Sequence, residues 1–292
     1  MSVPMSMFRH QGAVLRALGQ AAFGGQGQGS IPPLPGPERV SELPPRDDAL
    51  VDAYVRHLGC EPGAWAGEIP PHLFPQWTFP ISGQVLATLP FPLAKTLNAG
   101  CALTVRGPIP RGEPLIVRAR LTEVDDDGRR VLIKQRITTS TPSSEGAIEA
   151  ELTALVPLKR GGKGDGGDRG KKDRPIVPEG AKELARWDLD RWAGLDFAKL
   201  TGDVNPIHWV GPYARMAGFK GVILHGFSTF ARAFEGLRRE VGPISKLEVR
   251  FTRPVPLPSQ PGLFIDDRGG VFVGERPGEP ACMTGDYTER DA

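Results

Sequence analysis

The chain has 292 residues, of which 39% are hydrophobic and 24% are charged, and its formal net charge is +2. This composition fits a soluble globular protein with room for two domains of about 120–150 residues each. The small net charge excludes strong electrostatic attraction to nucleic acid or to a membrane surface, so we expect neither as a partner.

The first 36 residues differ in composition from the rest of the chain. They contain no acidic residue, and they include a Gly/Gln run at 24–29 and the start of a proline-rich run at 32–37. We expect residues 1–36 to form a flexible N-terminal extension. A basic transit peptide is the less favoured alternative, because such peptides are also poor in acidic residues.

The next notable stretch, residues 69–94, contains no Asp, Glu, Lys or Arg. Its six prolines would interrupt a membrane-spanning helix repeatedly, so we expect a loop followed by a buried helix or strand. Strand-like segments follow at 115–121, 131–138 and 148–156.

Residues 159–173 contain no apolar side chain and cannot bury surface to offset their ordering entropy. We therefore predict a linker over 159–177, which separates a first half at 37–158 from a second half at 178–292. In the second half we expect helices over 182–192 and 224–239, the latter with aromatic or apolar residues at a 3–4 spacing. A half-buried strand is expected around Leu247, Val249 and Phe251, which alternate with charged residues.

The two halves share a short sequence echo. Val105-Arg106 precedes Pro108-Ile109-Pro110 in the first half, and Val249-Arg250 precedes Pro254-Val255-Pro256 in the second. This match is weak alone, but together with the similar sizes and the linker it favours two copies of one fold.

The stretch Thr201-Gly202-Asp203-Val204-Asn205-Pro206-Ile207-His208 carries the clearest chemical signal. Asp203 and His208 would lie about 500° apart on a helix, so helical spacing does not pair them. Pro206 disfavours helical geometry at Asn205, and the predicted bend can aim both side chains at one point. A carboxylate and an imidazole at one point provide acid–base chemistry. An isolated Gly-Asp more often marks a turn or a helix cap, but the full eight-residue pattern together with His225-Gly226 favours catalysis.

This stretch resembles the signature of the hydratase 2 family, also called MaoC-like dehydratases. The match includes Phe197-Ala198 upstream, Gly-Asp-x-Asn-Pro-x-His, Tyr213-Ala214, Ile223-Leu224-His225-Gly226 and Phe251-x-x-Pro254-Val255. The resemblance implies an α+β double hot dog, in which two antiparallel sheets each wrap round a central helix. It also implies (R)-specific hydration of trans-2-enoyl thioesters and the reverse dehydration of (3R)-3-hydroxyacyl thioesters.

The same resemblance implies roles for individual residues. Asp203 and His208 would hold and activate the water, and the amide of Gly226 would join the oxyanion site at a helix start. We place Asn205, His225, Arg250 and Arg253 at the substrate, with Asn205 organising the turn and His225 more a packed than a reacting group. The two arginines would meet the phosphates of coenzyme A or of a carrier phosphopantetheine. We expect neither a metal nor a cofactor.

The first half lacks this pattern. Its corresponding stretch, His57 to Pro62, reads His-Leu-Gly-Cys-Glu-Pro, and no His-Gly precedes its predicted helix. The resemblance implies that this half is non-catalytic, shapes the acyl pocket and completes the pseudo-dimer. The second half also departs from the family after Pro254-Val255, where the usual Gly-Asp is absent.

The predicted protein is thus a cytoplasmic hydro-lyase that acts on acyl-CoA or acyl carrier protein thioesters, as a homodimer. A cytoplasmic location fits three widely separated cysteines that form no CxxC or Cys/His cluster, and these predict neither disulfides nor a zinc site. A hot-dog acyl thioesterase and a non-catalytic acyl-binding subunit remain the alternatives, and acyl-chain length stays open.

Overall fold

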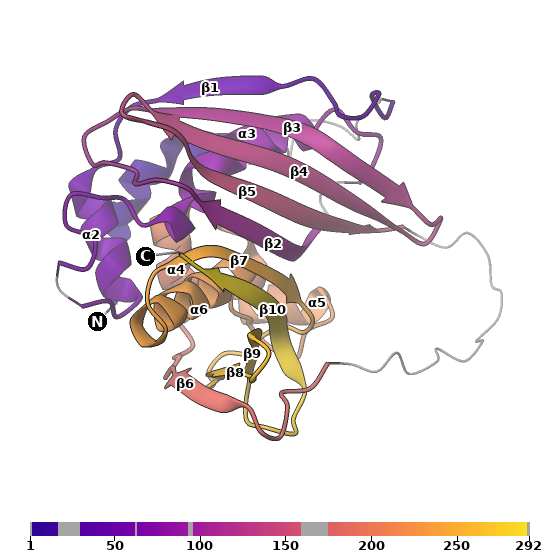
Figure 1. The fold of residues 1–292 in the computed structure, drawn as a ribbon. Helices are drawn as coiled ribbons and strands as arrows, with labels where there is room; N and C mark the ends of the chain where they lie inside the picture. The colour runs from indigo at the N-terminus through magenta and orange to yellow at the C-terminus, as the bar shows by residue number, and fades with distance from the viewer. Residues whose placement is uncertain (1, 17–29, 62, 93–95, 159–174, 291–292) are drawn as a thin grey trace.

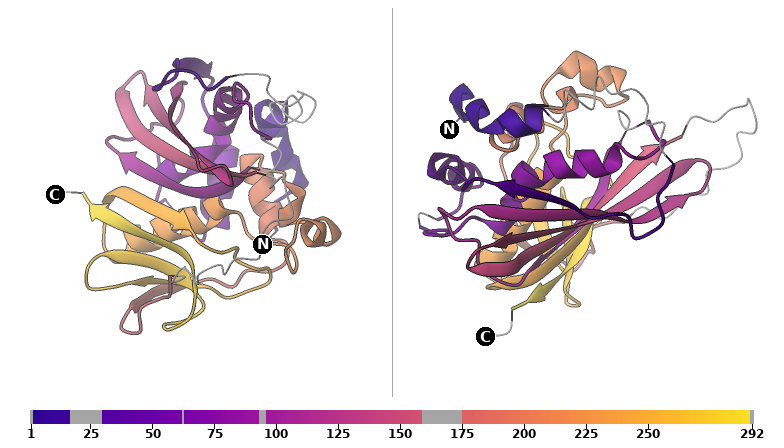
Figure 2. Two further views of the ribbon diagram at one scale, coloured as in Figure 1. Left: turned by 90° about the vertical axis from the view of Figure 1, so that its right-hand side faces the viewer. Right: turned by 90° about the horizontal axis from the view of Figure 1, so that it is seen from above.

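The computed structural model describes residues 2–16, 30–61, 63–92, 96–158 and 175–290. Within these ranges, ten strands form one antiparallel sheet in the order β1-β3-β4-β5-β2-β7-β10-β9-β8-β6. The sheet runs from β1 at the top of Figure 1 to β6 at the bottom. Figure 2 (right) shows helices of both halves gathered on one face of this sheet.

The first half supplies β1 (Arg39–Leu43), β2 (Leu97–Val105), β3 (Leu115–Asp126), β4 (Arg130–Thr141) and β5 (Ser144–Pro157). These include the three strand segments expected at 115–121, 131–138 and 148–156. In β4, buried and partly exposed side chains alternate along nearly the whole strand, because one face of the sheet is covered by helices.

The apolar stretch at 69–94 contains η2 (Pro71–Leu73) and the buried helix α3 (Pro75–Leu86). Trp77, Ile81 and Val85 of α3 are buried, and the Trp77 indole donates to Thr139 Oγ1 of β4 at 3.0 Å. Each buried side chain of this size contributes about 1.5–3 kcal/mol relative to exposure. A further helix, α2 (Asp48–His57), begins at the side-chain cap of Asp47.

The second half supplies β6 (Lys182–Arg186), β7 (Ile244–Phe251), β8 (Gly262–Ile265), β9 (Gly270–Gly274) and β10 (Ala281–Glu289). Its central helix, α6 (Gly226–Glu240), buries Phe227, Phe230, Phe234 and Leu237. The helix predicted at 224–239 is therefore confirmed. Three short helices precede it: α4 (Ala193–Thr201), η4 (Pro206–His208) and α5 (Gly211–Met216).

The helix predicted over 182–192 is wrong. Residues 182–186 form the edge strand β6, which pairs antiparallel with β8 from Lys182–Ile265 to Arg186–Gly262. Lys, Glu, Leu, Ala and Arg favour a helix locally, but the free edge of β8 satisfies the backbone of this segment in a strand.

The two halves meet edge to edge and repeat one local arrangement. β2 pairs with β7, from Gly100–Arg250 to Thr104–Lys246. In the first half the amide of Ile69 donates to the carbonyl of Ile109 at 2.8 Å, and in the second the amide of Leu224 donates to Val255 at 2.9 Å. The sequence echo thus marks equivalent positions of the two halves.

Two predicted segments differ from expectation or lie outside the described residues. Residues 2–16 do not form a free tether, because η1 (Met5–Gln11) packs against α4. Residues 159–174 of the predicted linker are not described, while Ile176 bridges Pro280 and Val177 is fully buried. Within the described ranges no helix has both the length and the apolar composition needed to cross a membrane.

Candidate active site

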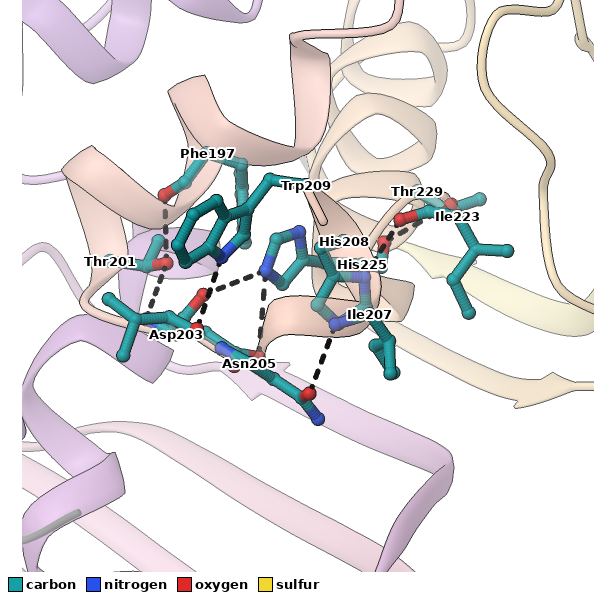
Figure 3. A network of polar contacts seen from close by, with 11 residues as sticks. Phe197, Thr201, Asp203, Asn205, Ile207, His208, Trp209, Ile223, His225 and Thr229 are labelled. Carbon is teal, nitrogen blue, oxygen red and sulfur yellow. Dashed lines mark hydrogen bonds and ion pairs between the residues drawn. The ribbon is translucent and has the colours of Figure 1, made fainter. Parts of the chain in front are cut away.

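The turn that carries Asp203 begins where α4 ends. Gly202 follows the helix with φ of 81°, a left-handed conformation that glycine adopts without strain, and its amide donates to Ala198 at 2.8 Å. Thr201 is buried and donates from its hydroxyl to the carbonyl of Phe197 at 2.9 Å. Beyond this helix end the chain turns, and the Asp203 side chain lies beside His225 (Figure 3).

Asn205 organises the second part of the turn. Its side-chain oxygen accepts from the amide of Ile207 at 3.3 Å, which caps the short helix η4, and Pro206 occupies the first position of that helix. The amide of Asn205 in turn donates to Asp203 Oδ1 at 3.4 Å. The predicted bend at Asn205-Pro206 is therefore present, and it brings His208 back toward Asp203.

His208 is held in one tautomer. It is 7% exposed, and its Nδ1 lies 2.8 Å from the carbonyl oxygen of Ile223. Only a protonated Nδ1 can make this hydrogen bond, so the lone pair of the neutral ring is on Nε2. Burial lowers the pKa of His208, while Asp203 and the Ile223 carbonyl act in the opposite direction. The ring is consequently neutral at pH 7 and can accept a proton.

His225 lies behind this pair. Its ring stacks on that of His208 with centroids 3.5 Å apart, and its Nε2 donates to the backbone carbonyl of Asp203 at 2.9 Å (Figure 3). Burial, and then the neighbouring His208, lower the pKa of His225 to about 3. His225 therefore stays uncharged and fixes the positions of His208 and Asp203.

The N-terminus of α6 completes the group. His225 is the N-cap residue and makes no side-chain cap, while the amides of Ser228 and Thr229 return to its carbonyl. The amide of Gly226 precedes the first intrahelical bond and is free to donate to a ligand, at the positive end of the helix dipole. A Cβ at Gly226 would lie 3.0 Å from ring atoms of Phe251, so a larger residue there would push this ring and the helix start apart by a few tenths of an ångström.

A cavity of about 500 Å³ opens over these groups. Asp203, His208 and Gly226 line it together with Asn205 and Arg253. The first half contributes Phe79 from α3 and the segment Thr96, Leu97 and Asn98 at the start of β2. A second depression of about 700 Å³ shares Arg253, Pro254, Val255 and Cys282 with this cavity, so the two are contiguous.

Of the four residues predicted to bind substrate, Asn205 and Arg253 line the cavity, whereas His225 and Arg250 do not. His225 is 1% exposed and is covered by His208. Arg250 is exposed on β7, where the buried Val249 points to the opposite face of the sheet. Arg250 therefore lies on the face opposite Val249, whereas Arg253 lies beyond the end of β7.

Asp203, His208 and His225 offer one carboxylate oxygen and two ring nitrogens within 4.8 Å of one another, which is also a donor set for a metal ion. One nitrogen of each ring is already hydrogen-bonded, His208 Nδ1 to Ile223 and His225 Nε2 to Asp203. His208 thus keeps a lone pair on Nε2, and His225 keeps one on Nδ1, which is buried and has no partner among the described residues.

The N-terminal segment supports this site, which local sequence patterns did not indicate. Gln11 is fully buried, and its amide group donates to the carbonyls of Lys199 and Leu200 at 3.1 and 3.0 Å. These are among the last carbonyls of α4, four and three residues before Asp203. Val14 packs directly over Gly202.

The chain is similar to known proteins over part or most of its length. Residues 193–263 match the family described as MaoC like domain. Enoyl-CoA hydratase ChsH3 of Mycobacterium tuberculosis is 33% identical over 140 residues, 47% of each chain. The 3-hydroxyacyl-thioester dehydratase X of the same organism is 26% identical over 254 residues, 83% of this chain and 86% of that protein.

Coverage differs among the relatives. The chain spans only 17% of a peroxisomal hydratase-dehydrogenase-epimerase of Neurospora crassa, which is 31% identical over 157 residues, and less than half of ChsH3. The crystal structure of HtdX from M. tuberculosis matches with a TM-score of 0.69 at 22% identity, over 87% of this chain and 100% of that one. A second M. tuberculosis structure, described as a double hotdog fold, matches with a TM-score of 0.54 at 14% identity, over 87% and 96%. Residues 193–263 thus match the MaoC like domain, and the chain folds as a double hot dog.

Proposed function

We propose that the protein catalyses (R)-specific hydration of trans-2-enoyl thioesters and the reverse dehydration of (3R)-3-hydroxyacyl thioesters. The observation that carries this proposal is the convergence of Asp203, a neutral His208 and the free amide of Gly226 on one cavity. Relatives named enoyl-CoA hydratase and 3-hydroxyacyl-thioester dehydratase support it.

The two side chains suit the proton balance of the reaction. In hydration the water oxygen forms a bond to C3, one water O–H bond breaks, and one proton is added to C2. A water between Asp203 and His208 would lose its proton to this pair, and the pair would return a proton to C2 as the enolate collapses. The lone pair at His208 Nε2 and the carboxylate of Asp203 are the acceptors available for this step.

The amide of Gly226 would stabilise the negative charge that develops on the thioester oxygen. A donor of this kind contributes roughly 3–4 kcal/mol to transition-state stabilisation, and the start of α6 adds its dipole. Phe251 packs against the Cα of Gly226 and keeps this helix end apolar, which strengthens the hydrogen bond.

We assign the acyl chain to the side of the cavity formed by Phe79 and by residues 96–98. Residues 37–158 would then be the non-catalytic half that shapes the acyl pocket, and 178–292 the catalytic half. Arg253, at the border with the neighbouring depression, is the group best placed for the phosphates of coenzyme A or a carrier phosphopantetheine. A cytoplasmic location agrees with the free thiols of Cys60, Cys101 and Cys282, and the homodimer stays a prediction.

The test is to add purified protein to crotonyl-CoA and to a longer trans-2-enoyl-CoA, and to follow both the enoyl absorbance and free thiol. The proposal expects loss of the enoyl absorbance, no thiol release, and a product of (3R) configuration on chiral analysis. Thiol release would identify a thioesterase instead. Saturable binding without turnover of either substrate would identify an acyl-binding subunit.

A further inference from the structure

A separate cavity of about 800 Å³ lies between the C-terminal end of α2, the segment that follows β6 and the C-terminal half of α6. Its lining includes five arginines against three carboxylates, those of Glu61, Asp188 and Glu235. The residues assigned above to the active site, Asp203, His208, Gly226 and Arg253, do not line it. We call it the arginine cavity.

Arg232 of α6 is the unusual member of this lining. The residue is 8% exposed, and its Nη2 lies 3.3 Å from His57 Nε2 and 3.4 Å from the His57 carbonyl oxygen. Its Nε is buried and has no hydrogen-bond partner among the described residues. A buried guanidinium with an unused donor is costly unless an acceptor occupies the adjacent space.

Neutral groups surround Arg232 on the protein side. Burial and then the Arg232 charge lower the pKa of His57 to about 3, so His57 is an uncharged acceptor. Burial lowers the pKa of Arg232 to about 10, opposed by Tyr54 and Cys60 rather than by a carboxylate. Arg232 is therefore charged at neutral pH, and its charge is not balanced by an adjacent described acid.

Three of the other four arginines in the lining already form ion pairs with carboxylates. Arg238 pairs with Glu235 at 2.9 Å, and Arg239 with Glu240 at 3.3 Å. Arg186 borders both this cavity and the depression beside Arg253, but it is occupied by Glu183 and by two backbone carbonyls. Arg56, at the end of α2, is exposed and is the flexible charge closest in sequence to His57.

The equivalent place in the other half is filled. Gly202 is the C-cap of α4 and has a φ of 81°, and Gly59, with a φ of 72°, follows Leu58, the C-cap of α2. Val14 of the N-terminal segment covers Gly202, whereas a Cβ at Gly59 would meet nothing within 4 Å. Val14 therefore covers the end of α4, whereas no described residue covers Gly59 in this way.

We propose that the arginine cavity binds the phosphate group of a small molecule, with Arg232 as its buried donor and Arg56 as its outer charge. Guanidinium groups match phosphate through charge-assisted hydrogen bonds, and Arg232 and Arg56 both line this cavity. A phosphate would place its negative charge beside the buried guanidinium of Arg232, which contacts the uncharged His57. This site is distinct from the proposed thioester cavity and does not depend on the activity proposed above.

The experiment is a titration of the full-length protein with inorganic phosphate and with pyrophosphate by isothermal calorimetry, at ionic strength held constant with chloride. We expect saturable binding that is weakened roughly tenfold or more in Arg232→Gln and less in Arg56→Gln. Arg129→Gln, at an exposed turn of the first half, is the matched control and should bind like the wild type. Because Arg56 is exposed, its variant remains informative if Arg232→Gln does not fold.

Two results would overturn this assignment. The first is an absence of saturable binding by the wild type to either anion. The second is binding that survives in both Arg232→Gln and Arg56→Gln but is lost in Arg253→Gln, which would place the anion at the thioester cavity. Crotonyl-CoA turnover in Arg56→Gln, measured alongside, should equal that of the wild type whichever anion binds.

Discussion

The substitution Gln11→Ala tests whether the N-terminal segment holds the turn that carries Asp203. It removes two buried hydrogen bonds, to the carbonyls of Lys199 and Leu200, and a third contact in which Gln76 donates to Gln11 Oε1 at 3.2 Å. At about 1 kcal/mol for each bond to α4, and about 1 kcal/mol for leaving buried groups unsatisfied, unfolding becomes easier by about 2–3 kcal/mol.

That loss corresponds to a Tm lower by about 3–5 °C for a chain of this size, measured by differential scanning calorimetry. The turnover of crotonyl-CoA should fall roughly tenfold, because the end of α4 is then free to shift relative to α6. Gln84→Ala is the control, since Gln84 is exposed on α3. If Gln11→Ala and Gln84→Ala have the same Tm and the same turnover, the N-terminal segment does not position the turn.

Two further predictions concern the site itself. Gly226→Ala should lower kcat/KM for enoyl-CoA at least roughly a hundredfold with a native circular dichroism spectrum, because a Cβ 3.0 Å from Phe251 displaces the amide from the ligand. Gly221→Ala, where a Cβ meets nothing within 4 Å, should leave kcat/KM unchanged, and equal losses in both variants would argue against the role of Gly226. The second prediction concerns the dependence of stability on pH. Burial lowers the pKa of His57, His208 and His225, so these side chains bind protons in the unfolded chain at a pH at which they stay neutral in the folded protein. The stability that these groups contribute is present above the unfolded pKa of about 6.5 and is lost as pH falls below it. Urea midpoints should therefore decrease steeply from pH 7 to pH 5, and a flat profile would contradict the neutral state of these rings.

The pattern of side chains predicted most of the regular structure. Alternation over 131–138 and the 3–4 spacing of Phe227, Phe230 and Phe234 reflect burial on one face, which acts within a few residues. Residues 182–186 were wrongly predicted to be helical. They pair as a strand with β8, about 80 residues later in the chain, and helix propensity depends only on neighbouring residues and cannot indicate such a distant partner.

The site could be predicted only in part for the same reason. The turn from Gly202 to His208 depends on local chemistry, so its residues were identified, and the helix start at Gly226 followed from its neighbours. Arg250 was placed at the substrate although the alternation of Leu247 and Val249 already directs it to the other face of β7. Phe79, the segment 96–98 and Gln11 reach the site through tertiary packing alone.

The measurement that tests the central claim most directly compares Asp203→Asn with Asp286→Asn in the hydration of crotonyl-CoA. Both residues follow Thr-Gly, but Asp203 lines the cavity, whereas Asp286 is exposed on β10. We expect at least roughly a hundredfold loss of kcat in Asp203→Asn and wild-type kcat in Asp286→Asn. Wild-type turnover by folded Asp203→Asn would contradict the assignment of the reaction to this site.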